Sequence, residues 1–186
     1  STGLTRNTVV GTDFQYRNSH VFGGHVLNLD TAYLRSFSST QGDDGEYTFS
    51  LQYPNEPWSG RFVFRQIGVN FAPALGFVNR TGIRDYVWDA EHLTRFSDPY
   101  YAWFNAGVYQ HFTTGLGNQL QSYFGQYYIG AANTVGDVVF LYIDREFERV
   151  PAAFNIGGAA NVTPGNYDWT VGEFLFDSSF GRKWYL

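Results

Sequence analysis

The stretch Glu46–Tyr53 reads EYTFSLQY and alternates without interruption between polar and apolar residues. Successive side chains of a β-strand point to opposite faces, so a period of two residues predicts a strand with one polar face and one apolar face. The apolar face is wholly aromatic or aliphatic. Turn-forming residues at Gly42–Gly45 and Pro54–Pro57 are expected to bound this strand.

The same alternation recurs along the rest of the chain and predicts an all-β fold. The expected strands are Thr8–Arg17, Val26–Phe37, Glu46–Tyr53, Trp58–Ile67, Ile83–Leu93, Tyr101–Phe112, Gln119–Ile129, Asp137–Phe147 and Trp169–Phe176, with the start of another at Lys183–Leu186. The clear segments are about 9 to 11 residues long, the length that a tilted strand needs to cross the hydrocarbon layer of a membrane. Three segments between Tyr101 and Phe147 carry aromatic residues on both faces, so their facing stays open.

Composition favours a membrane barrel over a soluble β-domain. The chain has 18 Phe, 14 Tyr and 5 Trp in 186 residues, and Lys183 is its single lysine. Soluble sheets usually protect their surface and edges with Lys and Glu, whereas outer-membrane barrels replace much of that surface with apolar side chains. The mean hydropathy of -0.28 does not exclude a membrane, because barrel strands are apolar only at every second residue.

Charge and cysteine content exclude other classes. A formal net charge of -5 argues against nucleic-acid binding, which normally needs a basic face. The absence of cysteine excludes disulfides, thiolate metal sites and a cysteine nucleophile.

Two stretches carry a resemblance to a known family. Ile67–Tyr86 contains Asn70-Phe71-Ala72-Pro73, then Leu75-Gly76-Phe77-Val78 and Arg80, and Phe154–Tyr167 contains a Pro164-Gly165 pair followed by an aromatic residue. With these motifs, and with Asn7–Arg17 and Gly42–Glu46, the chain resembles a family of outer-membrane β-barrels of uncharacterised function that usually follow a family-nine-type carbohydrate-binding module. The resemblance implies a bacterial outer-membrane location, a larger barrel and a separate sugar-binding domain. It supplies no catalytic residues.

We therefore expect one domain, residues 1–186, that forms a segment of an antiparallel up-and-down transmembrane β-barrel and is a fragment of a longer chain. About nine to ten strands are expected, and a barrel in lipid leaves no strand edge unpaired. Its expected partners are the lipid bilayer and further strands of the same chain or of other subunits. The long connections Gly68–Gly82 and Glu148–Tyr167 follow the fourth and eighth strands, so they should lie on one rim.

Alternation also assigns the two surfaces of the expected barrel, because a lumen tolerates polar groups and lipid does not. The candidate lumen-facing residues are Asp13, Gln15, Arg17, Glu46, Gln52, Arg61, Arg65, Asp85, Asp89 and Glu91. The candidate lipid-facing residues are Phe14, Tyr16, Tyr47, Phe49, Leu51, Tyr53, Phe62, Phe64, Tyr86 and Trp88.

Other kinds of site were weighed against this interpretation. His20 and His25 are more simply part of a polar turn than metal ligands, since a third ligand is not evident, and Asp43-Asp44 is more simply a solvated turn than a Ca²⁺ loop. The acidic row Asp85, Asp89 and Glu91 has a spacing compatible with glycoside hydrolysis, but a polar wall facing the arginines of the neighbouring strand is the simpler interpretation. We expect no catalysis and no cofactor.

The main alternative is a soluble β-sandwich that binds carbohydrate. Its sugar-stacking platform would consist of Tyr47, Tyr53, Trp58, Tyr86 and Trp88. That alternative explains the aromatic residues but not the near absence of lysine.

Overall fold

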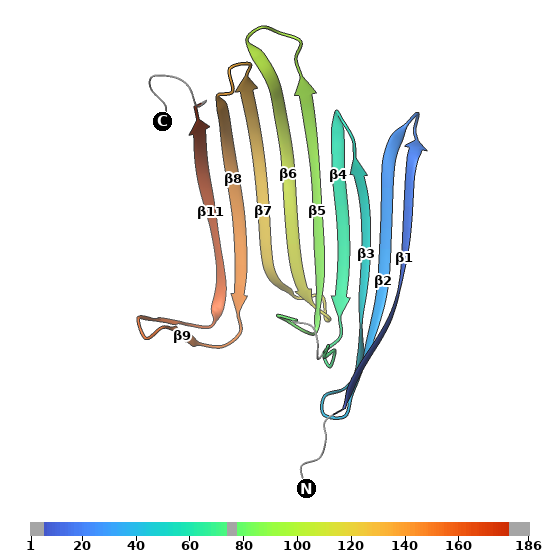
Figure 1. Ribbon diagram of the computed structural model, residues 1–186. Coiled ribbons are helices and arrows are strands. Elements are labelled where there is room, and N and C mark those ends of the chain that lie inside the picture. Colours follow the sequence, from blue (N-terminus) through green and yellow to red (C-terminus); the bar gives the residue numbers. More distant parts are fainter. Residues whose placement is uncertain (1–5, 74–77, 179–186) are drawn as a thin grey trace. The chain divides into compact units, whose positions relative to one another are not determined.

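The structure is a computed structural model and describes residues 6–73 and 78–178 (Figure 1). The strands are β1 (Asn7–Val21), β2 (His25–Ser38), β3 (Gly42–Pro54), β4 (Trp58–Ile67), β5 (Ile83–Arg95), β6 (Tyr101–Gly115), β7 (Leu120–Asn133), β8 (Val138–Val150), β9 (Phe154–Ile156), β10 (Ala160–Val162) and β11 (Gly165–Asp177). No helix in the described part of the chain is long and apolar enough to span a membrane.

Nine strands form one sheet in the order β1-β2-β3-β4-β5-β6-β7-β8-β11, and β9 and β10 form a separate two-stranded sheet. The large sheet runs up and down, with each strand beside the one before it, which confirms the expected all-β antiparallel topology. The order does not return from β11 to β1, so the described residues do not close a barrel by themselves. The long connections follow β4 and β8, two strands that run in the same direction, as expected.

Most strands are longer than alternation alone predicted, although β4 has the predicted bounds, and one predicted turn is wrong. β3 begins at Gly42, and Asp43 and Asp44 pair with Phe37 and Ser36 of β2. The turn is instead at residues 39–41, and Gly42 ends it with a φ of 87°, a left-handed conformation that favours glycine. The expected strand at Lys183–Leu186 lies outside the described residues.

Asp44 is held in the strand by bonds that the sequence pattern does not show. Its carboxylate accepts hydrogen bonds from the backbone N–H groups of Gly45 (2.8 Å) and Asn70 (3.0 Å). A carboxylate held by two backbone donors is part of the folded sheet, so the interpretation of Asp43-Asp44 as a solvated turn is wrong.

The described residues group into two compact units. Of the described residues, the first contains 6–53, 61–73, 78–87 and 112–120, and the second contains 54–60, 88–111 and 121–178. Strands β4, β5 and β6 therefore contribute residues to both units.

The first unit has a small apolar core where the connection after β4 folds back on the sheet. Ile67, Phe71 and Ile83 are buried together, with Leu34 and Val78 packed against them. The connection is fixed by backbone bonds: the N–H of Gly68 donates to the carbonyl of Gly45 (2.9 Å), and the N–H of Ala72 donates to Ser36 Oγ (3.0 Å). Leu75, Gly76 and Phe77 of the family-like motif lie outside the described residues.

The second unit has tight turns that satisfy their own backbone groups. Between β7 and β8, the Asn133 side-chain oxygen accepts hydrogen bonds from the N–H groups of Val135, Gly136 and Asp137. A short polar side chain that caps a turn in this way fixes where the hairpin reverses.

Candidate functional site

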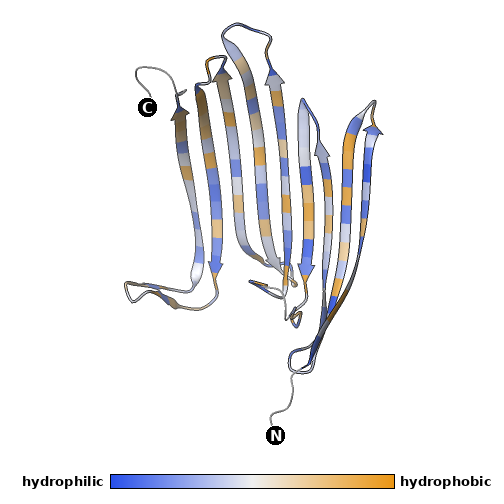
Figure 2. Ribbon diagram, in the orientation of Figure 1, coloured by the Kyte–Doolittle hydropathy of each residue, from blue (hydrophilic) through white to orange (hydrophobic). Residues whose placement is uncertain are grey.

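Strand register places the polar and apolar residues of the first unit on opposite faces. Tyr16 stands opposite Leu29 of β2, and Leu29 stands opposite Leu51 of β3. Residues that stand opposite one another share a face, so these three side chains form one cross-strand row. Figure 2 shows hydrophilic and hydrophobic residues alternating along the strands. We call the face of this row the apolar face of the first unit and the other its polar face.

Side-chain contacts extend both faces to β4 and β5. On the apolar face, the Phe49 and Phe62 ring centroids are 6.2 Å apart, and those of Phe64 and Tyr86 are 5.3 Å apart. On the polar face, Arg65 forms an ion pair with Asp85 at 3.0 Å. Alternate residues of one strand share a face, so Trp88 continues the side of Tyr86 on β5.

The structure therefore separates the two predicted sets of residues. Register, contacts and alternation put Phe14, Tyr16, Tyr47, Phe49, Leu51, Tyr53, Phe62, Phe64, Tyr86 and Trp88 on apolar faces, and Asp13, Gln15, Arg17, Glu46, Gln52, Arg61, Arg65, Asp85, Asp89 and Glu91 on polar faces. Which face meets lipid stays a prediction.

In the second unit, strand register shows which faces of β7 and β8 are apolar, a question that the sequence left open. Ile129 stands opposite Leu141 of β8, and Leu141 stands opposite Phe174 of β11. All three are exposed, and they define the apolar face of this unit. A signal for this face was present in β8, where Val139, Leu141 and Ile143 are all aliphatic, whereas the alternate residues Phe140, Tyr142 and Asp144 change from aromatic to acidic.

The polar face of the second unit carries a cluster that the sequence did not reveal. Glu91 accepts hydrogen bonds from the Tyr128 hydroxyl (2.6 Å) and from the Asn105 amide (3.2 Å). The Tyr128 ring lies 6.0 Å from that of Tyr142 and 6.4 Å from that of Phe140. Asn105 is only 9% exposed. The cluster is a mixed aromatic and polar wall in which the Glu91 carboxylate is held by neutral donors.

In the first unit, Asp85 has a comparable structural role. Besides its ion pair with Arg65, Asp85 accepts a hydrogen bond from the Thr113 hydroxyl at 2.7 Å. Asp85 and Glu91 are thus hydrogen-bonded within a polar surface. This agrees with the interpretation of the acidic row Asp85, Asp89 and Glu91 as a polar wall.

Two glycines make room for the rings of the polar wall. A Cβ on Gly107 would lie 2.4 Å from the Tyr128 ring, and a Cβ on Gly130 would lie 2.3 Å from the Phe140 ring and 2.5 Å from Asn105 Oδ1. The rings lie over bare backbone, which is the arrangement that lets an aromatic side chain cover a strand glycine.

We expect Gly130→Ala to lower the free energy of unfolding by about 1–3 kcal/mol, the usual cost of overpacking, because neither Phe140 nor Asn105 can withdraw without disturbing its neighbours. Chemical unfolding of the variant and of the unmodified chain measures this change in the free energy of unfolding. Gly117→Ala is the control, since a Cβ there meets nothing within 4 Å, and its effect should stay within about 0.5 kcal/mol. Equal stability of both variants would show that the rings do not pack as described.

A few charged side chains lie on the apolar faces, two of them near strand ends and one, Arg145, near the middle of β8. Arg35 stands over the Phe37 ring near the end of β2, and Arg84 near the start of β5 donates to Gln66 Oε1 at 2.7 Å. In the second unit, Arg145 pairs with Asp168 at 3.2 Å.

The turn between β3 and β4 carries an exposed ion pair. Arg95 donates two hydrogen bonds to Glu56, at 2.7 and 2.8 Å. These donors hold the pKa of Glu56 below its ordinary value because they favour the charged carboxylate. Nearby, the Trp58 and His92 rings meet edge to face at 4.4 Å.

His20 and His25, the two candidate metal ligands, contact other side chains. His20 lies beside Ser19, and His25 is hydrogen-bonded to the Tyr53 hydroxyl and meets its ring at 5.5 Å. Within residues 6–73 and 78–178, no group of three or more metal-binding side chains comes together.

Comparison of the chain with protein-family models, with curated proteins and with solved structures gives no match.

Proposed function

We propose that this chain is a wall segment of a bacterial outer-membrane β-barrel, with a structural, transport or anchoring role. Its apolar faces meet the lipid chains and its polar faces line the lumen. The observation that carries the proposal is the exposure of large apolar side chains along one face of each unit. Phe14 is 58% exposed in the first unit, and Ile143 and Phe174 are 57% and 65% exposed in the second.

Water is a poor solvent for these faces. Removing one large apolar side chain from water contributes about 1.5–3 kcal/mol, and soluble monomers rarely expose continuous apolar patches larger than a few hundred Å². Besides the nine-stranded sheet, the described residues form only the β9–β10 pair, with three residues in each strand. A sandwich needs two large sheets packed face to face. A lipid bilayer covers both apolar faces without a second sheet.

The two edge strands of the sheet, β1 and β11, indicate that the chain has partner strands. Within the described residues, β1 pairs only with β2, and β11 pairs only with β8. In hydrocarbon an unpaired backbone group costs several kcal/mol, so both edges need a neighbouring strand. Further strands of the same polypeptide or of other subunits would supply it. The family resemblance adds a carbohydrate-binding domain as a candidate neighbour.

Single cysteines test the assignment of the faces, since the chain contains no cysteine of its own. The variants are Thr48→Cys and Gln52→Cys on the polar face, and Phe49→Cys and Leu51→Cys on the apolar face. In lipid vesicles, a water-soluble maleimide should label the polar-face pair and leave the apolar-face pair unlabelled, because lipid excludes the reagent. Mass spectrometry of the labelled chain measures this.

The control is the same reaction after unfolding in denaturant, where all four variants should react. Rapid labelling of Phe49→Cys and Leu51→Cys in vesicles would contradict the membrane proposal. That result would favour the alternative, a water-exposed aromatic platform on a soluble carbohydrate-binding domain.

A further inference from the structure

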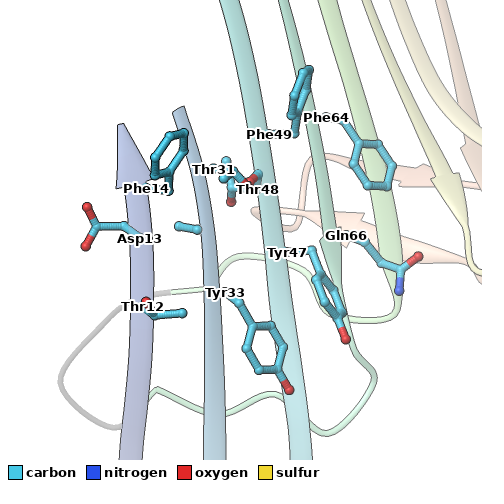
Figure 3. A pocket seen from close by; sticks show the side chains of 11 residues that line it. Thr12, Asp13, Phe14, Thr31, Tyr33, Tyr47, Thr48, Phe49, Phe64 and Gln66 are labelled. Carbon is cyan, nitrogen blue, oxygen red and sulfur yellow. The ribbon is translucent and has the colours of Figure 1, made fainter. Parts of the chain in front are cut away.

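The apolar face of the first unit contains an open hollow (Figure 3). Its volume is about 430 Å³, within the range of small-molecule sites. The lining residues are Thr12, Asp13, Phe14, Thr31, Ala32, Tyr33, Tyr47, Thr48, Phe49, Phe64 and Gln66.

A small residue between two large ones creates the hollow. Thr31 stands between Phe14 and Phe49 in one cross-strand row. The Thr31 hydroxyl donates to the Thr48 carbonyl at 3.1 Å, so its hydrogen-bonding capacity is used within the sheet. The floor of the hollow is therefore largely apolar.

The next row keeps the space open. Tyr33 stands opposite Thr12 and Tyr47, and its ring lies over Gly45, where a Cβ would be 2.8 Å from the ring. The Tyr33 and Tyr47 rings also contact each other, with centroids 4.7 Å apart. Because Tyr33 leans over Gly45, it does not fill the space above Thr31.

The hollow has an apolar end and a polar end. Phe14, Phe49 and Phe64 lie toward one end, and the Tyr33 and Tyr47 hydroxyls and Gln66 lie toward the other (Figure 3). Asp13 contributes to the rim, but it stands opposite Ala32, and Ala32 stands opposite Thr48, so all three side chains belong to the polar face of the sheet.

A positive charge lies beside the polar end. Arg84 donates through Nε to Gln66 Oε1 at 2.7 Å and through Nη1 to Asn118 Oδ1. Arg35 and Asp43, at the ends of β2 and β3, are on the same side of the sheet. These three charges sum to one positive charge, and a guanidinium is the group best suited to bind phosphate.

We propose that this hollow binds one phospholipid molecule. An acyl chain lies over Thr31 between the phenylalanine rings, and the phosphate lies at the tyrosine hydroxyls, Gln66 and Arg84. The inference rests on the proposed function, because the lipid reaches the hollow only if the apolar face lies in a bilayer.

The test uses the full chain purified in detergent, with phosphatidylglycerol added at known molar ratios and bound lipid counted by native mass spectrometry. One lipid should be retained. Thr31→Phe fills the hollow and should weaken retention by about tenfold or more, the equivalent of 1.4 kcal/mol. Leu29→Phe, on the same face of the same strand, should retain lipid as the unmodified chain does. Thr31→Val keeps the volume of the side chain and should also retain lipid.

A second arm tests the headgroup end. Arg84→Gln should weaken phosphatidylglycerol binding by about tenfold, because it removes the charge that faces the phosphate. It should leave the binding of diacylglycerol, which has no phosphate, unchanged. An equal loss for both lipids would show that Arg84 acts on the fold and not on the headgroup.

Equal retention by Thr31→Phe and Leu29→Phe would overturn the inference, as would a mass showing a second copy of the chain in place of lipid. The two proposals fail in different ways. If Phe49→Cys is labelled in vesicles, the membrane assignment fails. If Phe49→Cys is protected and no lipid is retained, only the lipid site fails.

Discussion

Phe49→Arg is expected to lower the free energy of unfolding from a lipid bilayer by about 2–4 kcal/mol, the cost of an arginine on the lipid face near the midplane. Phe49 lies within β3, five residues before its end at Pro54, and on the apolar face. Its ring contacts that of Phe62, so the substitution also removes a ring contact. Guanidinium unfolding of the chain from vesicles, followed by tryptophan fluorescence, measures the change.

Thr48→Arg is the matched control, since it places the same charge one residue away on the opposite face. Thr48 stands opposite Ala32, and Ala32 stands opposite Asp13, so the new guanidinium would have a carboxylate nearby on the polar face. We expect its effect to stay within about 0.5 kcal/mol. If the two variants are destabilised to the same extent, the two faces have the same surroundings and the membrane proposal is wrong.

Phe71→Ala is expected to cost about 3–5 kcal/mol, the range for removing a buried phenylalanine. Phe71 is 2% exposed and packs with Ile67 and Ile83. Without the ring, the connection after β4 keeps its backbone bonds to β2 and β3 but loses the largest side chain of the core. Chemical unfolding measures the loss, and limited proteolysis within residues 68–82 shows whether the connection detaches.

Val69→Ala is the control for this segment, because Val69 lies two residues before Phe71 and is 61% exposed. Its effect should be within about 0.5 kcal/mol. Comparable destabilisation by the two variants would mean that Phe71 does not anchor the connection. Under the proposed function, Ile67, Phe71 and Ile83 form an apolar anchor on the lumen side of the wall.

The features of the fold that the sequence predicted depend on residues that are close together in the chain. Alternation from Glu46 to Tyr53 depends only on residues two positions apart, so it identified the strand and divided its two faces correctly. Alternation did not show which face of β8 is the apolar one, because Phe140 and Tyr142 share a face with Asp144. Residue type alone does not distinguish an exposed aromatic ring from a ring that packs over a glycine.

The sequence by itself predicted the nine long strands, and it separated polar from apolar residues in the first five of them, since period-two patterning and turn residues are local properties. Only the tertiary structure decided which side chains meet across strands. The contact of Ala72 with Ser36 joins residues 36 positions apart, and the hollow at Thr31 depends on the register of β1, β2 and β3 together. A one-residue shift in register would move every side chain of a strand to the other face, and no single strand encodes that pairing.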